Sequence, residues 1–155
     1  MRLSRFVVAL ALVGTCIFAV DALAKQSPAY EQAGVAKGTT IKLGSTRFGK
    51  IAETGSSRAI YIFTKEKGKT PRCYGECAKA WPPVMTSGAP VAGKGISRSK
   101  LGTSKRKGGK TQVTYNGHPL YRYVNDKSAH EVRCQAVDEF GGIWYVIDGS
   151  GDAKK

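Results

Sequence analysis

Three of the four cysteines, together with one histidine, have the residue types of a metal or redox site. Cys73 and Cys77 are separated by three residues, and His130 precedes Cys134 at the same spacing. Three thiolates and one imidazole can bind zinc tetrahedrally. In an oxidising compartment the alternative is a structural disulfide. We expect the disulfide, with Cys134 joined to Cys73 or Cys77, because closing a loop of about 60 residues restricts the unfolded chain more than closing the short Cys73–Cys77 loop.

The sequence gives little support to a catalytic function. His118 lies beside an expected turn, and Ser128 is too close in sequence to His130 to form a triad with it. Neither Gly-x-Ser-x-Gly nor His-Glu-x-x-His occurs. Cys77 is followed by Ala78 rather than histidine, which excludes c-type haem attachment. We therefore expect no enzyme and no cofactor.

An aromatic motif, Tyr-x-aromatic followed three residues later by an acid, occurs twice. Its residues are Tyr61, Phe63 and Glu66 in the first copy, and Tyr121, Tyr123 and Asp126 in the second. Because residues two apart in a strand face the same side, each aromatic pair could be a platform for a ligand that the carboxylate orients. We favour the alternative, in which the aromatic side chains fill the core and Asp126 caps the turn after its strand.

The charge of the chain is strongly positive, with 25 Lys and Arg against 11 Asp and Glu in 155 residues. No acid lies between Glu76 and Asp126. Seven cations lie within residues 94–110: Lys94, Arg98, Lys100, Lys105, Arg106, Lys107 and Lys110. A field of one sign attracts polyanions, here an anionic envelope component or an acidic glycan, and no nucleic acid is expected outside the cytosol. The alternative is a solvated basic surface without a partner.

Residues 1–24 have the pattern of a cleaved export signal. Two arginines precede an uncharged stretch, residues 6–20, and Ala22 and Ala24 are the small residues that a signal peptidase reads. The stretch is shorter than the roughly 20 residues of a membrane-spanning helix, so we expect no transmembrane span in the mature chain. Lipidation at Cys16 is the alternative. The expected location is the periplasm or the cell exterior.

The sequence after the export signal predicts a flexible lead-in over residues 25–37, a single mainly β domain over 38–149 and a tail over 150–155. Hydrophobic alternation and β-branched residues predict strands at 40–43, 47–51, 59–64, 111–115, 119–124 and 141–147. One short helix is expected near residues 73–81, ended by two prolines. Asn116-Gly117 predicts a tight hairpin turn.

Two segments, about residues 48–66 and 110–126, have the same order of strand, glycine turn, strand and aromatic motif. A single hairpin cannot bury its aromatic face alone. We therefore expect an internal duplication in which two related antiparallel hairpins pack together as a small sheet or barrel-like domain.

Seven segments resemble a family of secreted bacterial repeats of unknown function, often labelled lipoproteins, that carries a Tyr-x-(Phe/Trp/Tyr)-x-x-Asp motif. They are residues 48–51, 60–63, 73–83, 101–103, 112–117, 119–123 and 141–146. The second motif copy is complete, whereas the first ends in Glu66 instead of aspartate. The resemblance implies export and a repeat-built β domain, and it implies no reaction.

These features favour an exported, non-catalytic envelope binding or structural module that uses the basic residues of 94–110 against an anionic partner. The alternative is a metal- or redox-linked periplasmic accessory protein that uses Cys73, Cys77, His130 and Cys134.

Overall fold

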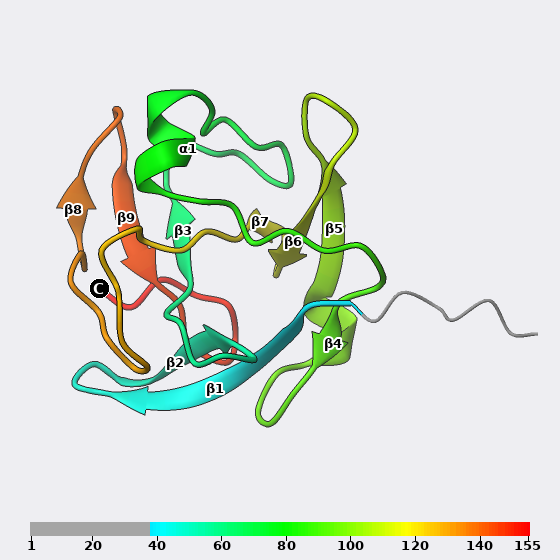
Figure 1. Ribbon diagram of the computed structural model, residues 1–155. Coiled ribbons are helices and arrows are strands. Elements are labelled where there is room, and N and C mark those ends of the chain that lie inside the picture. The colour runs from blue at the N-terminus through cyan, green and yellow to red at the C-terminus, as the bar shows by residue number, and fades with distance from the viewer. Residues whose placement is uncertain (1–37) are drawn as a thin grey trace, which may run out of the picture. The chain divides into compact units, whose positions relative to one another are not determined.

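The computed structural model describes residues 38–155, and this part of the chain is mainly β, as predicted (Figure 1). The export signal, the lead-in and Cys16 lie outside the described residues. The strands are β1 (Thr40–Thr46), β2 (Gly49–Thr54), β3 (Tyr61–Phe63), β4 (Val91–Ala92), β5 (Leu101–Lys105), β6 (Thr111–Tyr115), β7 (His118–Pro119), β8 (Val137–Asp138) and β9 (Ile143–Val146). The helices are α1 (Glu76–Ala80) and a 3₁₀ turn, η1 (Arg98–Lys100). Neither of them has the length and hydropathy needed to cross a membrane.

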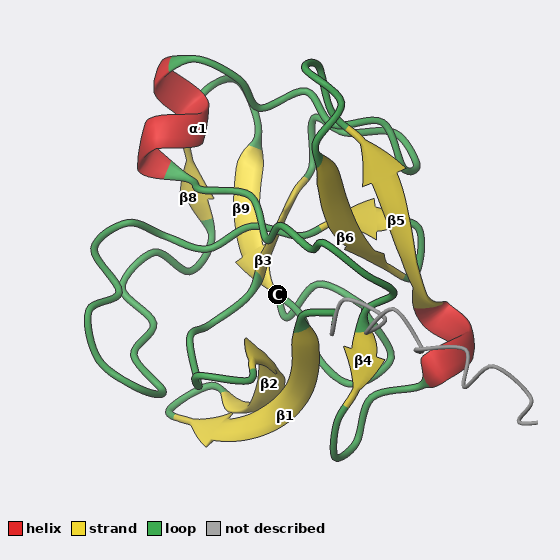
Figure 2. Cartoon of the chain, turned by 45° about the vertical axis from the view of Figure 1, so that its right-hand side comes forward, coloured by secondary structure: helices red, strands yellow, loops and turns green. Residues whose placement is uncertain are grey.

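The strands form three small sheets, in the orders β2-β1-β4, β3-β9-β8 and β5-β6-β7 (Figure 2). Most neighbours are antiparallel, and β1 with β4 is the parallel pair among the described strands. The sheets do not close on themselves. Each is short because the chain leaves a hairpin after a few residue pairs and crosses to the next sheet.

Tight turns define the hairpins. Asn116 and Gly117, between β6 and β7, have φ of 46° and 81°. Positive φ at both central residues gives the turn whose twist matches antiparallel strands, so the predicted hairpin turn is confirmed. At the tip between β5 and β6, Gly108 and Gly109 have φ of 82° and 77°.

The strand predicted over residues 119–124 is shorter than expected. Leu120 still donates its N–H to the carbonyl of Val113, but Tyr121 leaves this sheet and forms isolated bridges with Tyr61 and Pro83. The other hairpin behaves alike: Ile60 donates to Ala52, and β3 then pairs with β9. Alternation in the sequence does not reveal this change of partner, because each strand remains extended through it.

Residues 150–155, expected to be a tail, instead fold back on the sheet. Ala153 forms a bridge with Ile147, and the Lys154 N–H donates to the carbonyl of Val146. Asp148 makes the reversal possible because its Oδ1 accepts the N–H of Ser150 at 2.9 Å and its N–H donates to the carbonyl of Asp152.

Two clusters of buried side chains form the core. One cluster is aromatic and contains the disulfide cysteines; its largest members are Tyr61, Phe63, Trp81, Tyr121 and Trp144. The other is mainly aliphatic and includes Ile41, Ile60, Val84, Val113, Leu120 and Ile147. Burial of apolar area in these clusters is the main stabilising term of the fold.

Candidate functional site

The two copies of the aromatic motif meet backbone to backbone. The N–H of Tyr61 donates to the carbonyl of Tyr121 at 2.9 Å, and the N–H of Tyr121 donates to the carbonyl of Tyr61 at 3.0 Å. Because each residue gives the other the same bond, the two motifs are related by an approximate two-fold axis at this bridge.

The tyrosine hydroxyls extend this exchange to the motif acids. The Tyr61 hydroxyl donates to Oδ2 of Asp126 at 2.7 Å, and the Tyr121 hydroxyl donates to Oε1 of Glu66 at 2.5 Å. Each tyrosine therefore bonds to the acid of the other copy. All four side chains are buried. The order of residues that the two copies share thus produces contacts between the copies.

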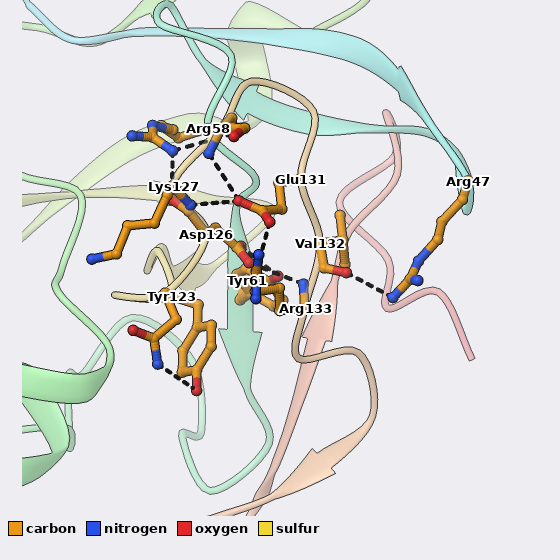
Figure 3. A network of polar contacts seen from close by, with 11 residues as sticks. Arg47, Arg58, Tyr61, Tyr123, Asp126, Lys127, Glu131, Val132 and Arg133 are labelled. Atoms are coloured by element: carbon orange, nitrogen blue, oxygen red, sulfur yellow. Dashed lines mark hydrogen bonds and ion pairs between the residues drawn. The ribbon is translucent and has the colours of Figure 1, made fainter.

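The motif acids also fix the loops that follow them. Glu66 Oε1 accepts the N–H of Arg72 at 2.7 Å, and Asp126 Oδ1 accepts the N–H of Arg133 at 2.9 Å (Figure 3). Burial raises the pKa of Glu66 and of Asp126 above their ordinary values. The expectation that Asp126 caps the following turn agrees with this geometry. Both carboxylate oxygens of Asp126 and Oε1 of Glu66 accept hydrogen bonds within the chain, whereas the buried Oε2 of Glu66 has no hydrogen-bond partner among the described residues.

The motif aromatics belong to a stack of four rings. Phe63 lies parallel to Trp144 with ring centroids 4.1 Å apart, and Trp144 lies parallel to Trp81, also at 4.1 Å. Tyr123 lies against Trp81 at 4.7 Å with its plane tilted by 39°. The order Phe63, Trp144, Trp81, Tyr123 has the same two-fold symmetry, because each motif aromatic covers one tryptophan.

The motif tyrosines close the sides of this stack. Tyr61 meets Trp81 edge-on at 5.1 Å, and Tyr121 meets Trp144 edge-on at 5.3 Å. Offset and edge-on contacts are the favourable geometries for aromatic pairs. Both indole N–H groups are satisfied by one residue: Trp81 donates to the Glu139 carboxylate and Trp144 to the Glu139 carbonyl. Three of the four motif aromatics, Tyr61, Phe63 and Tyr121, are therefore core, as expected, and both tryptophans are buried with them. Tyr123 is half-buried at one end of the stack.

The disulfide joins Cys73 to Cys77, with Cα atoms 5.3 Å apart, and Cys134 is a free thiol. The expectation of a bridge to Cys134 was wrong. Cys77 lies in α1 and Cys73 just before it, so the tight entry to the helix brings the two within bridging distance. Cys134 follows Arg133 as Cys73 follows Arg72, so the second copy repeats the first cysteine without its partner.

The zinc alternative does not fit this arrangement. Cys73 and Cys77 are oxidised in the bridge and offer no thiolate. Burial raises the pKa of Cys134, which keeps its thiol protonated. Nδ1 of His130 lies 3.0 Å from Oε1 of the buried Glu53. Within residues 38–155 no three His, Cys, Asp or Glu side chains gather as a metal-binding group.

The seven predicted polyanion-binding cations do not form one patch. Lys94, Arg98 and Lys100 lie before or at the start of β5, whereas Lys105, Lys107 and Lys110 surround the tip between β5 and β6. A five-residue strand of about 15 Å separates the two groups.

Arg106 is a correction to the predicted set, because its side chain is buried. It donates to Oε1 of Gln112 at 2.6 Å and to the carbonyl of Cys73 at 2.5 Å. A guanidinium has several donors in a fixed geometry, which suits it to joining two backbone segments. Arg106 therefore attaches the hairpin tip to the disulfide loop and is unavailable to a polyanion.

The ring of Tyr74 brings a second basic segment to the hairpin tip. The Arg106 guanidinium lies 4.3 Å from this ring centroid, and the Lys107 ammonium lies 5.4 Å from it. The loop before Tyr74 runs between α1 and the β5–β6 tip (Figure 1). Its exposed cations were missed by the sequence analysis, although the run of charges in residues 65–72 was the available signal. We call the joint set the hairpin-tip surface; it consists of Lys67, Lys69, Arg72, Lys105, Lys107 and Lys110.

Comparison with known proteins gives one match. Residues 102–148 are similar to a family described as a secreted repeat of unknown function. The matched stretch contains the second motif copy, Tyr121 to Asp126, together with Cys134 and Trp144. No curated protein and no solved structure matches the chain.

Proposed function

From the match to a family of secreted repeats, we propose that the chain is an exported, non-catalytic binding module that engages anionic polymers through its hairpin-tip surface. The motif residues support a structural role for the duplicated core, because both motif acids are bonded within the chain. Recognition is then left to the surface. An anionic envelope component or an acidic glycan is the partner class that this charge suits.

The observation that carries the proposal is the convergence of two basic segments at the tip. The six cations of the hairpin-tip surface are exposed. Tyr74, two residues after Arg72, contacts Arg106 and Lys107 of the tip through its ring. The neighbouring acids are neutralised locally: Glu66 is buried, and Glu76 pairs with Lys79 at 2.6 Å. The tip therefore presents positive charge with little compensation.

The other end of β5 provides a contrast. Lys100 donates to the carbonyl of Ser150 at 2.7 Å, and the side chains of Asp148 and Asp152 both bond to this serine. Two carboxylates there oppose the field of the nearby lysine and of Arg98. The proposal therefore places polymer binding at the tip and not at residues 94–100.

The test compares two charge-matched double variants on immobilised polygalacturonate, with neutral dextran as the blank. Lys107→Glu with Lys110→Glu should reduce retention of the full chain by about tenfold at about 0.05 M salt, where screening is weak. Lys94→Glu with Arg98→Glu changes net charge equally and should reduce it by less than about twofold.

Equal losses in the two variants would mean that only net charge matters and would overturn the site. Retention of the wild type on dextran, or retention that survives about 0.5 M salt, would overturn the electrostatic mechanism. All four side chains are exposed, and Lys107→Glu removes the contact of the Lys107 ammonium with the Tyr74 ring. Circular dichroism of both variants checks that each folds.

A further inference from the structure

Strand β5 lies at the outer edge of its sheet, whose order is β5-β6-β7 (Figure 2). It pairs with β6 along its whole length, from Leu101 with Tyr115 to Lys105 with Thr111. No other strand within residues 38–155 pairs with it. One side of the β5 backbone therefore has no neighbouring strand in this part of the chain.

The hydrogen bonds that flank β5 show which of its residues bond to β6. The Asn116 N–H donates to the carbonyl of Lys100, and the Arg106 N–H donates to the carbonyl of Lys110, both at 2.9 Å. In an antiparallel pair, residues that bond to the partner strand alternate with residues whose main chain points away from it. The even-numbered residues of β5 therefore bond to β6, and its odd-numbered residues direct their N–H and carbonyl groups outward.

Most of these outward groups are unused within the described part of the chain. The N–H of Leu101 donates to the carbonyl of Arg98. The N–H and carbonyl groups of Thr103 and Lys105, and the carbonyl of Leu101, form no hydrogen bond with residues 38–155. The side chains of Thr103 and Lys105 are exposed. The edge of β5 therefore presents a row of free donors and acceptors, which is a template for a further strand.

The other long edge strand, β2, is covered in comparison. Ala52 donates its N–H to the carbonyl of Ile147, and its carbonyl accepts the N–H of Ile60. Thr54 donates its N–H to the carbonyl of Arg58. The fold thus satisfies outward groups at two positions of β2 and leaves those of β5 open.

Cations surround the open edge. Five of them have exposed or half-buried side chains and lie just before β5, at its end or in the turn after it: Arg98, Lys100, Lys105, Lys107 and Lys110. A second copy of the chain, paired with the same edge about a two-fold axis, would bring these cations together. Like charges opposite one another destabilise a strand pair, and an edge lysine is a common protection against self-association. The charge therefore opposes a second copy and suits an acidic strand.

We propose that β5 accepts an extended acidic segment of another protein as an additional strand, with a carboxylate of that segment opposite Lys105. Main-chain hydrogen bonds to Thr103 and Lys105 supply the affinity, and the pair of opposite charges supplies the selectivity. Lys105 Nζ donates to Thr111 Oγ1 at 2.9 Å, and this neutral partner leaves the charge of the ammonium uncompensated. The inference concerns a protein partner and goes beyond polymer binding at the hairpin-tip surface, with which it shares Lys105.

The test titrates the full chain with a synthetic peptide of about seven residues, in which Glu alternates with Thr and Val, long enough to pair with β5. The amide NMR signals of Thr103 and Lys105 should shift with saturation, and their hydrogen exchange should slow, because the peptide carbonyls accept their N–H groups. Two control peptides have all backbone amides N-methylated, which prevents strand pairing at the same charge, or Lys in place of Glu. Each should bind about tenfold more weakly or worse.

Two variants at one position separate the backbone of β5 from its side chains. Thr103→Pro removes an outward N–H, and an edge strand accepts proline where the N–H faces solvent. It should weaken binding of the acidic peptide by about tenfold or more. Thr103→Ala keeps the N–H and should leave the affinity within about twofold. Neither should change retention on polygalacturonate, so failure at this edge and failure at the hairpin-tip surface are distinguishable.

Each other outcome overturns the assignment. Equal binding of the N-methylated peptide would mean that charge acts without strand pairing, and equal binding of the Lys peptide would remove the preference for acids. Wild-type dimers in sedimentation that Thr103→Pro abolishes would make a second copy the occupant. Absence of any shift at the Thr103 and Lys105 amides would remove the site. Circular dichroism checks that Thr103→Pro folds, and if it does not, the N-methylated peptide on the wild type decides alone.

Discussion

The two motif copies share their buried residues and differ at their exposed ones. Tyr61 and Tyr121 make the same backbone bridge and the same bond to the opposite acid. By contrast, Phe63 is buried in the first copy, while Tyr123 is half-exposed in the second. The residues that relate the copies therefore build the core, and those that distinguish them provide the surface on which recognition can differ.

The largest effect is expected at the centre of the ring stack, where the copies meet. Trp81→Ala and Trp144→Ala each remove a fully buried ring and should lower the free energy of unfolding by about 3–5 kcal/mol. Tyr123→Ala, at the open end, should cost clearly less because its ring is half-exposed. Chemical denaturation measures all three. A loss for Tyr123→Ala as large as for Trp144→Ala would show that the open end is core after all.

The next largest effect is expected at the hydrogen bonds that each motif tyrosine donates to the acid of the other copy. Tyr61→Phe and Tyr121→Phe each leave a buried acid without its hydroxyl donor and should cost about 1.5–3 kcal/mol of unfolding free energy. Tyr145→Phe is the matched control, because Tyr145 is only half-buried and its hydroxyl bonds to no described residue; it should cost less than about 0.5 kcal/mol. If only one of the two motif variants is destabilised, the two copies are not equivalent in the core.

The same two acids should make the stability of the folded protein depend on pH. Burial raises the pKa of Glu66 and Asp126, so the folded state holds these protons more tightly than the unfolded state. Their contribution to stability is therefore fully present below the unfolded carboxyl pKa of about 4 and is lost as pH rises through the folded value. Glu131, whose pKa is lowered by bonds from the Ser128 N–H and Arg133, acts in the opposite direction.

Comparing wild type with Glu66→Gln separates these effects. The difference in unfolding free energy between the two proteins should change as pH is raised from about 4 towards neutrality, in the direction that the wild type loses stability relative to the variant. Denaturation curves at several pH values measure it. A difference in unfolding free energy that does not change with pH would mean that the pKa of Glu66 is the same in the folded and unfolded states.

The disulfide is another difference between the copies, and we expect its effect on stability to be intermediate in size. Closing the Cys73–Cys77 loop is worth about 2 kcal/mol in the chain-entropy description, so reduction should lower the unfolding free energy by about that amount. Cys134→Ser should change it by less than about 0.5 kcal/mol. Alkylation of the folded, non-reduced protein should label one thiol among residues 38–155; labelling at Cys73 or Cys77 would contradict the bridge.

Local pattern predicted the fold class, the short helix and the turn at Asn116-Gly117, because each depends on residues adjacent in sequence. Pairing between distant segments was not predictable. The bridge between Tyr61 and Tyr121 and the bond from Arg106 to Cys73 join residues that no alternation or spacing relates. The cation at position 106 therefore looked like surface in the sequence and is core in the structure.

The cysteine pairing failed for a related reason. Loop entropy favours the long bridge to Cys134, but it describes the unfolded chain, whereas the folded backbone decides which cysteines can meet.

The smallest effect contrasts the turns that precede the two motif copies. Gly117 has φ of 81°, so Gly117→Ala should lower the free energy of unfolding by about 1 kcal/mol through backbone strain. In the first copy the positive φ, 60°, falls on Ser57 and not on Gly55. Ser57→Gly should therefore relieve strain, with a gain below about 1 kcal/mol. Gly55→Ala should cost less than Gly117→Ala because Gly55 has no positive φ, although its new Cβ would lie 3.3 Å from the Cβ of Thr40. Thermal unfolding of the three variants checks these signs, and destabilisation by Ser57→Gly would show that its side chain supports the turn more than its backbone strains it.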